Sequence, residues 1–104
     1  MSWFILIVAG IFEICWAVGL KYSNGFTKFW PSVFTATNYI LSIIFLSYAV
    51  KEIPLGTAYA IWTGIGAFGT AILGIFLFSE SSEFVRLFFI FLIVAGIAGL
   101  KIYS

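Results

Sequence analysis

Four long apolar stretches, separated by three short polar breaks, account for most of this 104-residue chain. They cover about residues 3–20, 30–50, 55–78 and 84–103, and each is long enough for a helix that crosses the roughly 30 Å hydrocarbon core of a bilayer. The stretches lack the alternation of half-buried strands, and four strands are too few to close a membrane barrel. The pattern predicts an all-α membrane protein with a single four-helix transmembrane domain over residues 1–104.

The composition supports the bilayer as the solvent for most of the chain. Hydrophobic residues make up 63% and charged residues 9%, whereas charged residues average about 25% in soluble domains. The net charge of +1 gives no electrostatic basis for binding nucleic acid. With no histidine and one cysteine, the sequence offers no metal site, cofactor site or nucleophile–base pair, so we do not expect an enzyme.

Glu13 is the charged residue within the first apolar stretch. At about 1.5 Å of rise per residue, it lies near the middle of a spanning helix. An ionisable group at this depth is costly and is a functional-site hypothesis by default. Residues three or four positions away share its helical face, and among them is Trp16, whose indole N–H can donate to a carboxylate.

Two other stretches carry residues that could face Glu13. Ser42 lies at mid-span in the second stretch, within a polar stripe that we expect to face the interior of the bundle. Tyr59 and Trp62 share a face of the third stretch, and aromatic rings beside a carboxylate can bind organic cations through cation–π attraction. The alternative interpretation is that both rings pack in the core.

Small residues mark two places where helices could approach closely. Gly64 and Gly66 lie in the third stretch, where they could form a hinge or simply permit close packing. Ala95 and Gly99 in the fourth stretch form a small-xxx-small pair, with Gly96 beside Ala95. We interpret this second group as a packing surface between two chains.

The basic residues give almost no instruction about orientation in the membrane. Two of them lie on the side of the N-terminus and three on the other side; they are Lys51 and Lys101, and Lys21, Lys28 and Arg86. Because the Lys and Arg bias sets the orientation, we predict that the chain inserts both ways and forms an antiparallel homodimer. The two orientations would supply the inverted symmetry common in alternating-access transporters. The alternative is that another signal fixes one orientation.

Two facing copies of Glu13 would define a coupling mechanism. Protons and a cation compete for the same carboxylate oxygens, and this competition couples their movements across the membrane. If both carboxylates must be cleared of protons, two protons exchange for one cation.

The chain resembles the small multidrug resistance family over essentially its whole length. The resemblance rests on the four-span layout, Glu13, the Lys21–Phe26 turn and the run Gly56-Thr-Ala-Tyr-Ala-Ile-Trp-Thr-Gly-Ile-Gly66. It implies an antiparallel, dual-topology dimer that exports cations in exchange for protons. The implied location is the inner or plasma membrane of a bacterium.

Within that family the chain resembles the guanidinium exporter subtype. This resemblance rests on Trp16, on Thr57 and on the segment Gly99-Leu-Lys101. It implies that guanidinium and small guanidinyl compounds are the substrates and that Glu13 binds both substrate and protons. It also implies that the site is lined by Trp16, Ser42, Tyr59 and Trp62, the first two as hydrogen-bond partners of Glu13.

Two further functions stay open at this point. A polyspecific exporter of quaternary ammonium cations has the same layout. A non-transporting structural membrane subunit would instead pair Glu13 with a basic residue of its partner. The role of Asn38, and a heterodimer with a paralogue in place of the homodimer, also stay open.

Overall fold

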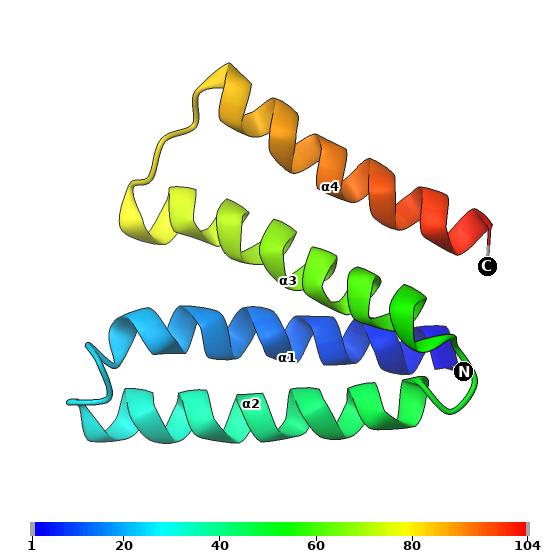
Figure 1. Ribbon diagram of the computed structural model, residues 1–104. Helices are drawn as coiled ribbons and strands as arrows, with labels where there is room; N and C mark the ends of the chain where they lie inside the picture. Colours follow the sequence, from blue (N-terminus) through cyan, green and yellow to red (C-terminus); the bar gives the residue numbers. More distant parts are fainter. Residues whose placement is uncertain (1, 104) are drawn as a thin grey trace.

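A computed structural model describes residues 2–103, so the first and last residues of the predicted domain lie outside the described residues. Across this range the chain forms four α-helices, shown in Figure 1: α1 (Ser2–Tyr22), α2 (Phe29–Ala49), α3 (Leu55–Phe78) and α4 (Phe84–Ile102). Each is long and apolar enough to cross a membrane. The predicted all-α architecture with four spans is therefore confirmed.

Short connections place successive helices side by side in antiparallel order. Asn24 and Gly25, after α1, have φ angles of 50° and 71°, a left-handed conformation that these two residue types adopt readily. Ser79 ends α3 with a φ angle of 54°. The α1–α2 and α3–α4 connections lie at one end of the bundle, and the α2–α3 connection lies at the other end with both termini (Figure 1).

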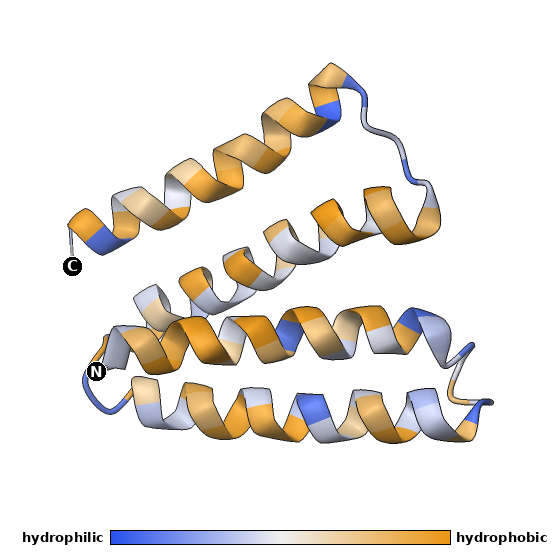
Figure 2. Cartoon of the chain, turned by 180° about the vertical axis from the view of Figure 1, so that it is seen from behind, coloured by the Kyte–Doolittle hydropathy of each residue, from blue (hydrophilic) through white to orange (hydrophobic). Residues whose placement is uncertain are grey.

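α1 occupies the centre of the packing. It contacts both α2 and α3 along its length, whereas in the described part of the chain α4 packs on α3 alone. The buried core includes Leu6 and Ala9 of α1 with Ala58, Ile61 and Trp62 of α3. Figure 2 shows hydrophobic residues along all four helices, with hydrophilic residues mainly at their ends and in the connections. Such surfaces suit contact with lipid or with a second chain.

Candidate functional site

Glu13 lies midway along α1, with its carboxyl group against α3. A Cβ atom built at Gly66 would meet Glu13 Oε1 at 2.5 Å and Glu13 Cγ at 2.8 Å. A side chain at position 66 would therefore collide with the carboxyl group. Gly66 allows the acid to rest directly on the main chain of α3.

The second glycine of α3 has a different neighbour. A Cβ atom at Gly64 would meet Ile97 of α4 at 3.0 Å, so Gly64 permits close approach of α3 and α4. The helix continues through Gly64 and Gly66 without a break. These contacts support the close-packing interpretation, and a hinge at these glycines stays a prediction.

A cavity of about 240 Å³ lies beside the Glu13 carboxyl group, between α1 and α3. Its lining combines the acid with small and hydroxyl-bearing residues: Glu13, Trp16 and Ala17 of α1, and Thr63, Gly66, Ala67 and Thr70 of α3. Small side chains on both helices leave this volume free. The structure thus brings Glu13 and Trp16 to one cavity, as their shared helical face indicates.

Three residues that line this cavity each have a buried polar atom that makes no hydrogen bond to any described residue: Glu13 Oε1, Trp16 Nε1 and Thr70 Oγ1. Buried polar atoms are usually paired, because an unpaired one loses its hydration without compensation. All three residues line the same hollow. A carboxyl oxygen, an indole N–H and a hydroxyl without partners, on residues around one free volume, suit a site for a polar ligand.

Ser42 and Trp62 are held by each other and by α1. Trp62 Nε1 donates a hydrogen bond of 2.8 Å to Ser42 Oγ, and Ser42 Oγ donates one of 2.7 Å to the carbonyl oxygen of Ala9. This buried chain of hydrogen bonds joins α1, α2 and α3. In the single chain, the Ser42 hydroxyl therefore connects helices, while the lining of the Glu13 cavity comes from α1 and α3.

Tyr59 lies one turn from Trp62 and faces outward. Its ring packs on the Trp62 ring with centroids 5.6 Å apart, and the residue is 56% exposed. Trp16 forms a similar pair, since its ring meets the Tyr39 ring edge-on with centroids 5.3 Å apart. The predicted aromatic residues thus belong to two separate pairs: Tyr59 packs with Trp62, whereas Trp16 packs with Tyr39, which was not among the predicted site residues.

The predicted packing surface of α4 is open in the single chain. A Cβ atom at Gly96 or Gly99 would meet nothing within 4 Å, and Ala95 is exposed. Ile97 and Ile93 are the α4 side chains against Gly64 of α3, whereas Gly96 and Gly99 have no such neighbour. They are free to contact a second chain.

Thr70 is the cavity residue that the sequence reasoning missed. It follows Gly66 by four residues and Thr63 by seven, so all three lie on one face of α3. The hydroxyl spacing was the signal that could have identified it. Thr70 adds a group that can both donate and accept a hydrogen bond, whereas the Trp16 indole donates only.

These features define a multi-pass membrane protein whose cavity holds a carboxyl group at mid-span. Among the described residues, no group of three His, Cys, Asp or Glu side chains could hold a metal ion. The chemistry on offer is that of one carboxyl group, one hydroxyl and one indole N–H. A carboxylate in such a place can accept a proton or bind a cation.

Comparison with known proteins identifies the family to which this membrane protein belongs. Residues 1–93 match the family described as Small Multidrug Resistance protein, and the chain belongs to this family. It is a multi-pass protein of the bacterial inner membrane.

Curated relatives match along their whole length. The chain is 60% identical to a protein named guanidinium exporter from Proteus vulgaris over 104 residues, which is 100% of both chains. It is 57% identical to a protein of the same name from Salmonella typhimurium over 102 residues, covering 98% of this chain and 97% of the relative. A third guanidinium exporter, from Yersinia pestis, is 54% identical with 100% of both chains covered.

Proposed function

We propose that this protein is a proton-coupled antiporter that exports guanidinium ion and small guanidinyl compounds. The observation that carries the proposal is the α1–α3 cavity, in which Glu13 Oε1 is buried and unpaired beside Trp16 Nε1 and Thr70 Oγ1. Full-length relatives named guanidinium exporters, at 54–60% identity, support the choice of substrate.

The shape and chemistry of the cavity favour a small planar cation. Guanidinium presents pairs of N–H groups in one plane, a geometry that matches a carboxylate. The cavity of one chain is about 240 Å³, below the roughly 300–1,000 Å³ of pockets that hold drug-sized ligands. Glu13 would bind the cation directly, Thr70 would accept a further N–H, and Trp16 would donate to the Glu13 carboxylate.

Coupling follows from competition at Glu13. A proton and a guanidinium ion neutralise the same carboxylate, so binding of one weakens binding of the other. With two copies of Glu13 facing one site, two protons exchange for one cation. Each cycle then moves one net charge, worth about 2.3 kcal/mol per 100 mV of membrane potential.

An antiparallel homodimer would complete the transporter. The small residues Gly96 and Gly99 of α4, where an added Cβ atom would meet nothing within 4 Å, offer a surface for close helix approach. The Tyr59 ring packs on Trp62 and is exposed in the single chain, so a second chain could cover it and make it part of a shared site. The small difference in basic residues between the two ends of the bundle suits insertion in both orientations.

Transport by purified protein in liposomes tests the proposal. In liposomes with an acidic interior, the outward-directed proton gradient should drive uptake of radiolabelled guanidinium, and outward guanidinium movement should carry protons inward. Glu13→Gln should abolish this exchange while the dimer stays folded. The matched control is Glu83→Gln, which removes a carboxylate from the exposed α3–α4 connection and should transport normally.

Two results would contradict the proposal. Proton-coupled uptake of a bulky quaternary ammonium ion, without uptake of guanidinium, would assign the protein to the polyspecific exporters. Loss of assembly in Glu13→Gln, with no transport by the wild-type protein, would indicate a structural subunit in which Glu13 pairs with a partner.

A further inference from the structure

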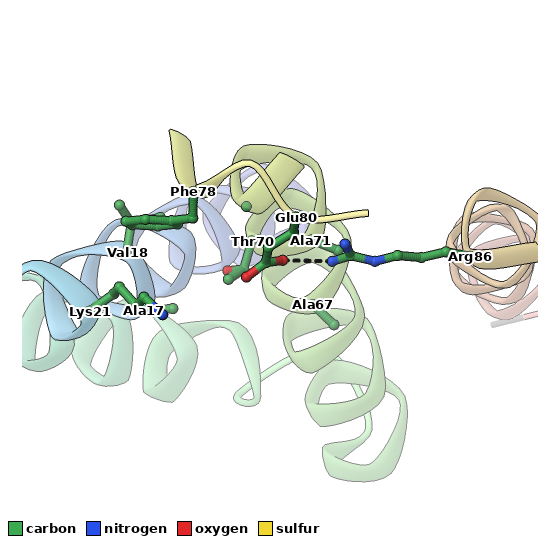
Figure 3. Close-up of a pocket in the computed structure, with 10 residues that line it drawn as sticks. Ala17, Val18, Lys21, Ala67, Thr70, Ala71, Phe78, Glu80 and Arg86 are labelled. Carbon is green, nitrogen blue, oxygen red and sulfur yellow. Dashed lines mark hydrogen bonds and ion pairs between the residues drawn. The ribbon is translucent and has the colours of Figure 1, made fainter. Parts of the chain in front are cut away.

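A second, larger cavity continues from the Glu13 cavity toward the end of the bundle. Its volume is about 370 Å³, and Figure 3 shows it between α1, α3 and the start of α4. Both cavities are lined by Ala17, Ala67 and Thr70. The hydroxyl of Thr70, which has no hydrogen-bond partner among the described residues, lies at this junction. The two cavities therefore adjoin each other, and together their linings extend from Glu13 to Glu80, just beyond the end of α3.

The outer cavity has one carboxylate in its lining, that of Glu80. Glu80 follows α3 and turns back onto it, because a Cβ atom at Gly74 would meet Glu80 Cδ at 2.8 Å. Two basic residues also line the outer cavity, Lys21 and Arg86. The amino group of Lys21 lies over the Phe78 ring, 5.4 Å from its centroid. Glu80 is thus the acceptor that the outer cavity presents to a cation.

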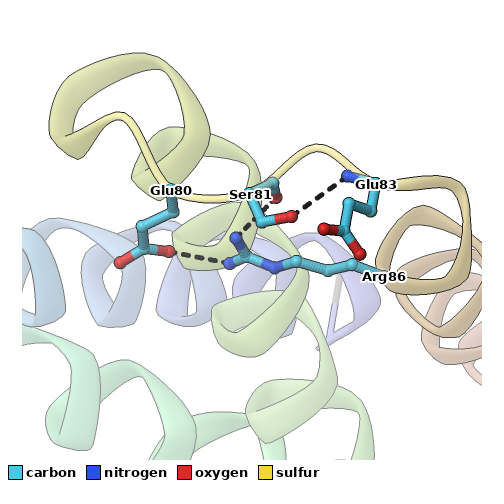
Figure 4. A network of polar contacts seen from close by, with 4 residues as sticks. All are labelled: Glu80, Ser81, Glu83 and Arg86. Carbon is cyan, nitrogen blue, oxygen red and sulfur yellow. Dashed lines mark hydrogen bonds and ion pairs between the residues drawn. The ribbon is translucent and has the colours of Figure 1, made fainter.

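A guanidinium group already occupies this acceptor. Arg86 reaches from α4 to Glu80 Oε1, to which its Nη2 donates a hydrogen bond of 2.7 Å. Its Nη1 donates a second bond of 2.7 Å to the carbonyl oxygen of Ser81 (Figure 4). A carboxylate oxygen and a carbonyl oxygen together bind two nitrogen atoms of one planar guanidinium. A free guanidinium ion carries the same planar set of N–H groups.

We infer that Glu80 Oε1 and the Ser81 carbonyl oxygen form a second guanidinium site at the mouth of the transport route, and that Arg86 is its tethered occupant. This inference rests on the proposed transport of guanidinium. A substrate ion exchanges with the Arg86 side chain at the mouth and then moves past Thr70 to Glu13. The exchange is feasible because the pair is partly exposed, with 31% of the Arg86 side chain and 42% of the Glu80 side chain accessible, and such ion pairs are weak.

Competition predicts a distinctive pattern in the guanidinium concentration that gives half-maximal transport. Arg86→Gln leaves the Glu80–Ser81 site open to guanidinium and should lower this concentration about two- to five-fold, the range expected for release of an exposed ion pair. Glu80→Gln removes the site and should raise it. The double variant should behave as Glu80→Gln does, since Arg86 then has no site to occupy.

Arg86→Lys is the matched control for charge. Lysine keeps the positive charge but lacks the planar fork that spans Glu80 and Ser81. If Arg86 competes as a guanidinium, Arg86→Lys should also lower the half-saturating concentration. A value equal to wild type would overturn the inference in favour of simple charge repulsion. Shifts of Arg86→Gln and Glu80→Gln in the same direction would overturn it in favour of a structural latch.

Binding measurements separate this inference from the proposed function. In the Glu13→Gln background the inner site is disabled, so calorimetry with guanidinium chloride on detergent-purified protein reports the mouth alone. Glu13→Gln/Arg86→Gln protein should bind guanidinium, and addition of Glu80→Gln should abolish that binding. Equal binding by the two proteins, or none by either, overturns the mouth site whatever the transport assay shows. Size-exclusion profiles that match wild type show that each variant is folded.

Discussion

The carboxyl group of Glu13 lies directly against Gly66, so the main chain of α3 forms one wall around the acid. This contact sets the position of the carboxyl group relative to Trp16 and Thr70, which line the same cavity. Gly66, which the sequence marks as a possible hinge, therefore makes room for the Glu13 carboxyl group because it has no side chain. The contact gives a direct test of how closely transport depends on the placement of Glu13.

Gly66→Ala should impair transport without removing any polar group. The added methyl group would lie 2.5 Å from Glu13 Oε1, so the carboxyl group must move. Misplacement of a reacting or binding group by about 1 Å can reduce rates by up to 100-fold, and we expect a loss of about 10- to 100-fold in the rate of guanidinium uptake. Overpacking should also lower the free energy of unfolding by about 1–3 kcal/mol.

Gly56→Ala is the control for this substitution. A Cβ atom at Gly56 meets nothing within 4 Å, and alanine is favoured over glycine in a helix by about 1 kcal/mol. We expect normal transport and unchanged or slightly raised stability. Normal transport by Gly66→Ala would show that the Glu13 carboxyl group can move without loss of function.

The Ser42–Trp62 hydrogen bond should contribute to stability as a coupled pair. Ser42→Ala and Trp62→Phe each remove one partner of the 2.8 Å bond. Hydrogen bonds between spanning helices contribute about 0.6 kcal/mol on average and up to about 1.7 kcal/mol. Because this bond is buried and continues to Ala9, we expect a coupling energy of about 1–2 kcal/mol in a double-mutant cycle, measured by unfolding in mixed detergent micelles.

Ser47→Ala is the matched serine control. Ser47 is exposed on α2, and its hydroxyl donates to the carbonyl oxygen of Ile44 in the same helix. Its removal should change the free energy of unfolding by less than about 0.5 kcal/mol. A coupling energy near zero for Ser42 and Trp62 would mean that the two residues stabilise the bundle independently.

The sequence predicts the helices of this protein better than it predicts contacts between them. Apolar runs long enough to span a bilayer identify the four helices, because lipid forces backbone hydrogen bonds to be made within each span. Helical spacing also places Glu13 and Trp16 on one face, and both line one cavity. These features depend on local periodicity, which a single sequence contains.

Contacts across helices depend on rotation and depth, which periodicity leaves undetermined. Ser42 is equally compatible with a bond to Glu13 and with the observed bonds to Ala9 and Trp62. The Glu80–Arg86 pair depends on how the chain turns back after α3, a path that no motif in the segment indicates. Helical spacing does place Thr70 on the same face as Thr63 and Gly66, so this cavity residue could have been predicted from the sequence.

The small residues of α4 should determine assembly. Gly96→Leu places a large side chain on a surface that is open in the single chain. If this surface packs against a second copy, the substitution should weaken dimerisation about 10-fold or more, as measured by energy transfer between labelled chains diluted in lipid. Val94→Phe is the control, because Val94 is exposed and is not three or four residues from Ala95, Gly96 or Gly99. Equal dimerisation by the two variants would remove α4 from the interface.

Orientation in the membrane should respond to very few charges. Three basic residues at one end of the bundle oppose two at the other. Thr27→Lys with Ser82→Lys, both in exposed connections at the first end, changes this balance to five against two. Since Lys and Arg residues are retained on the cytoplasmic side, the variant should insert with a single orientation. Accessibility of a terminal tag from one side of the membrane would report this, and transport should fall to background.

Co-expression with an oppositely biased chain tests whether both orientations are needed. Lys21→Gln and Lys28→Gln, combined with Ile102→Lys and Tyr103→Lys at exposed positions of the other end, change the balance to one against four, which favours the reverse insertion. Each biased variant alone should export little guanidinium, and the two together should restore export, because antiparallel pairs can then form. Full transport by the Thr27→Lys/Ser82→Lys variant alone, with its tag on one side, would mean that chains of one orientation suffice and that the transporter is built without inverted symmetry.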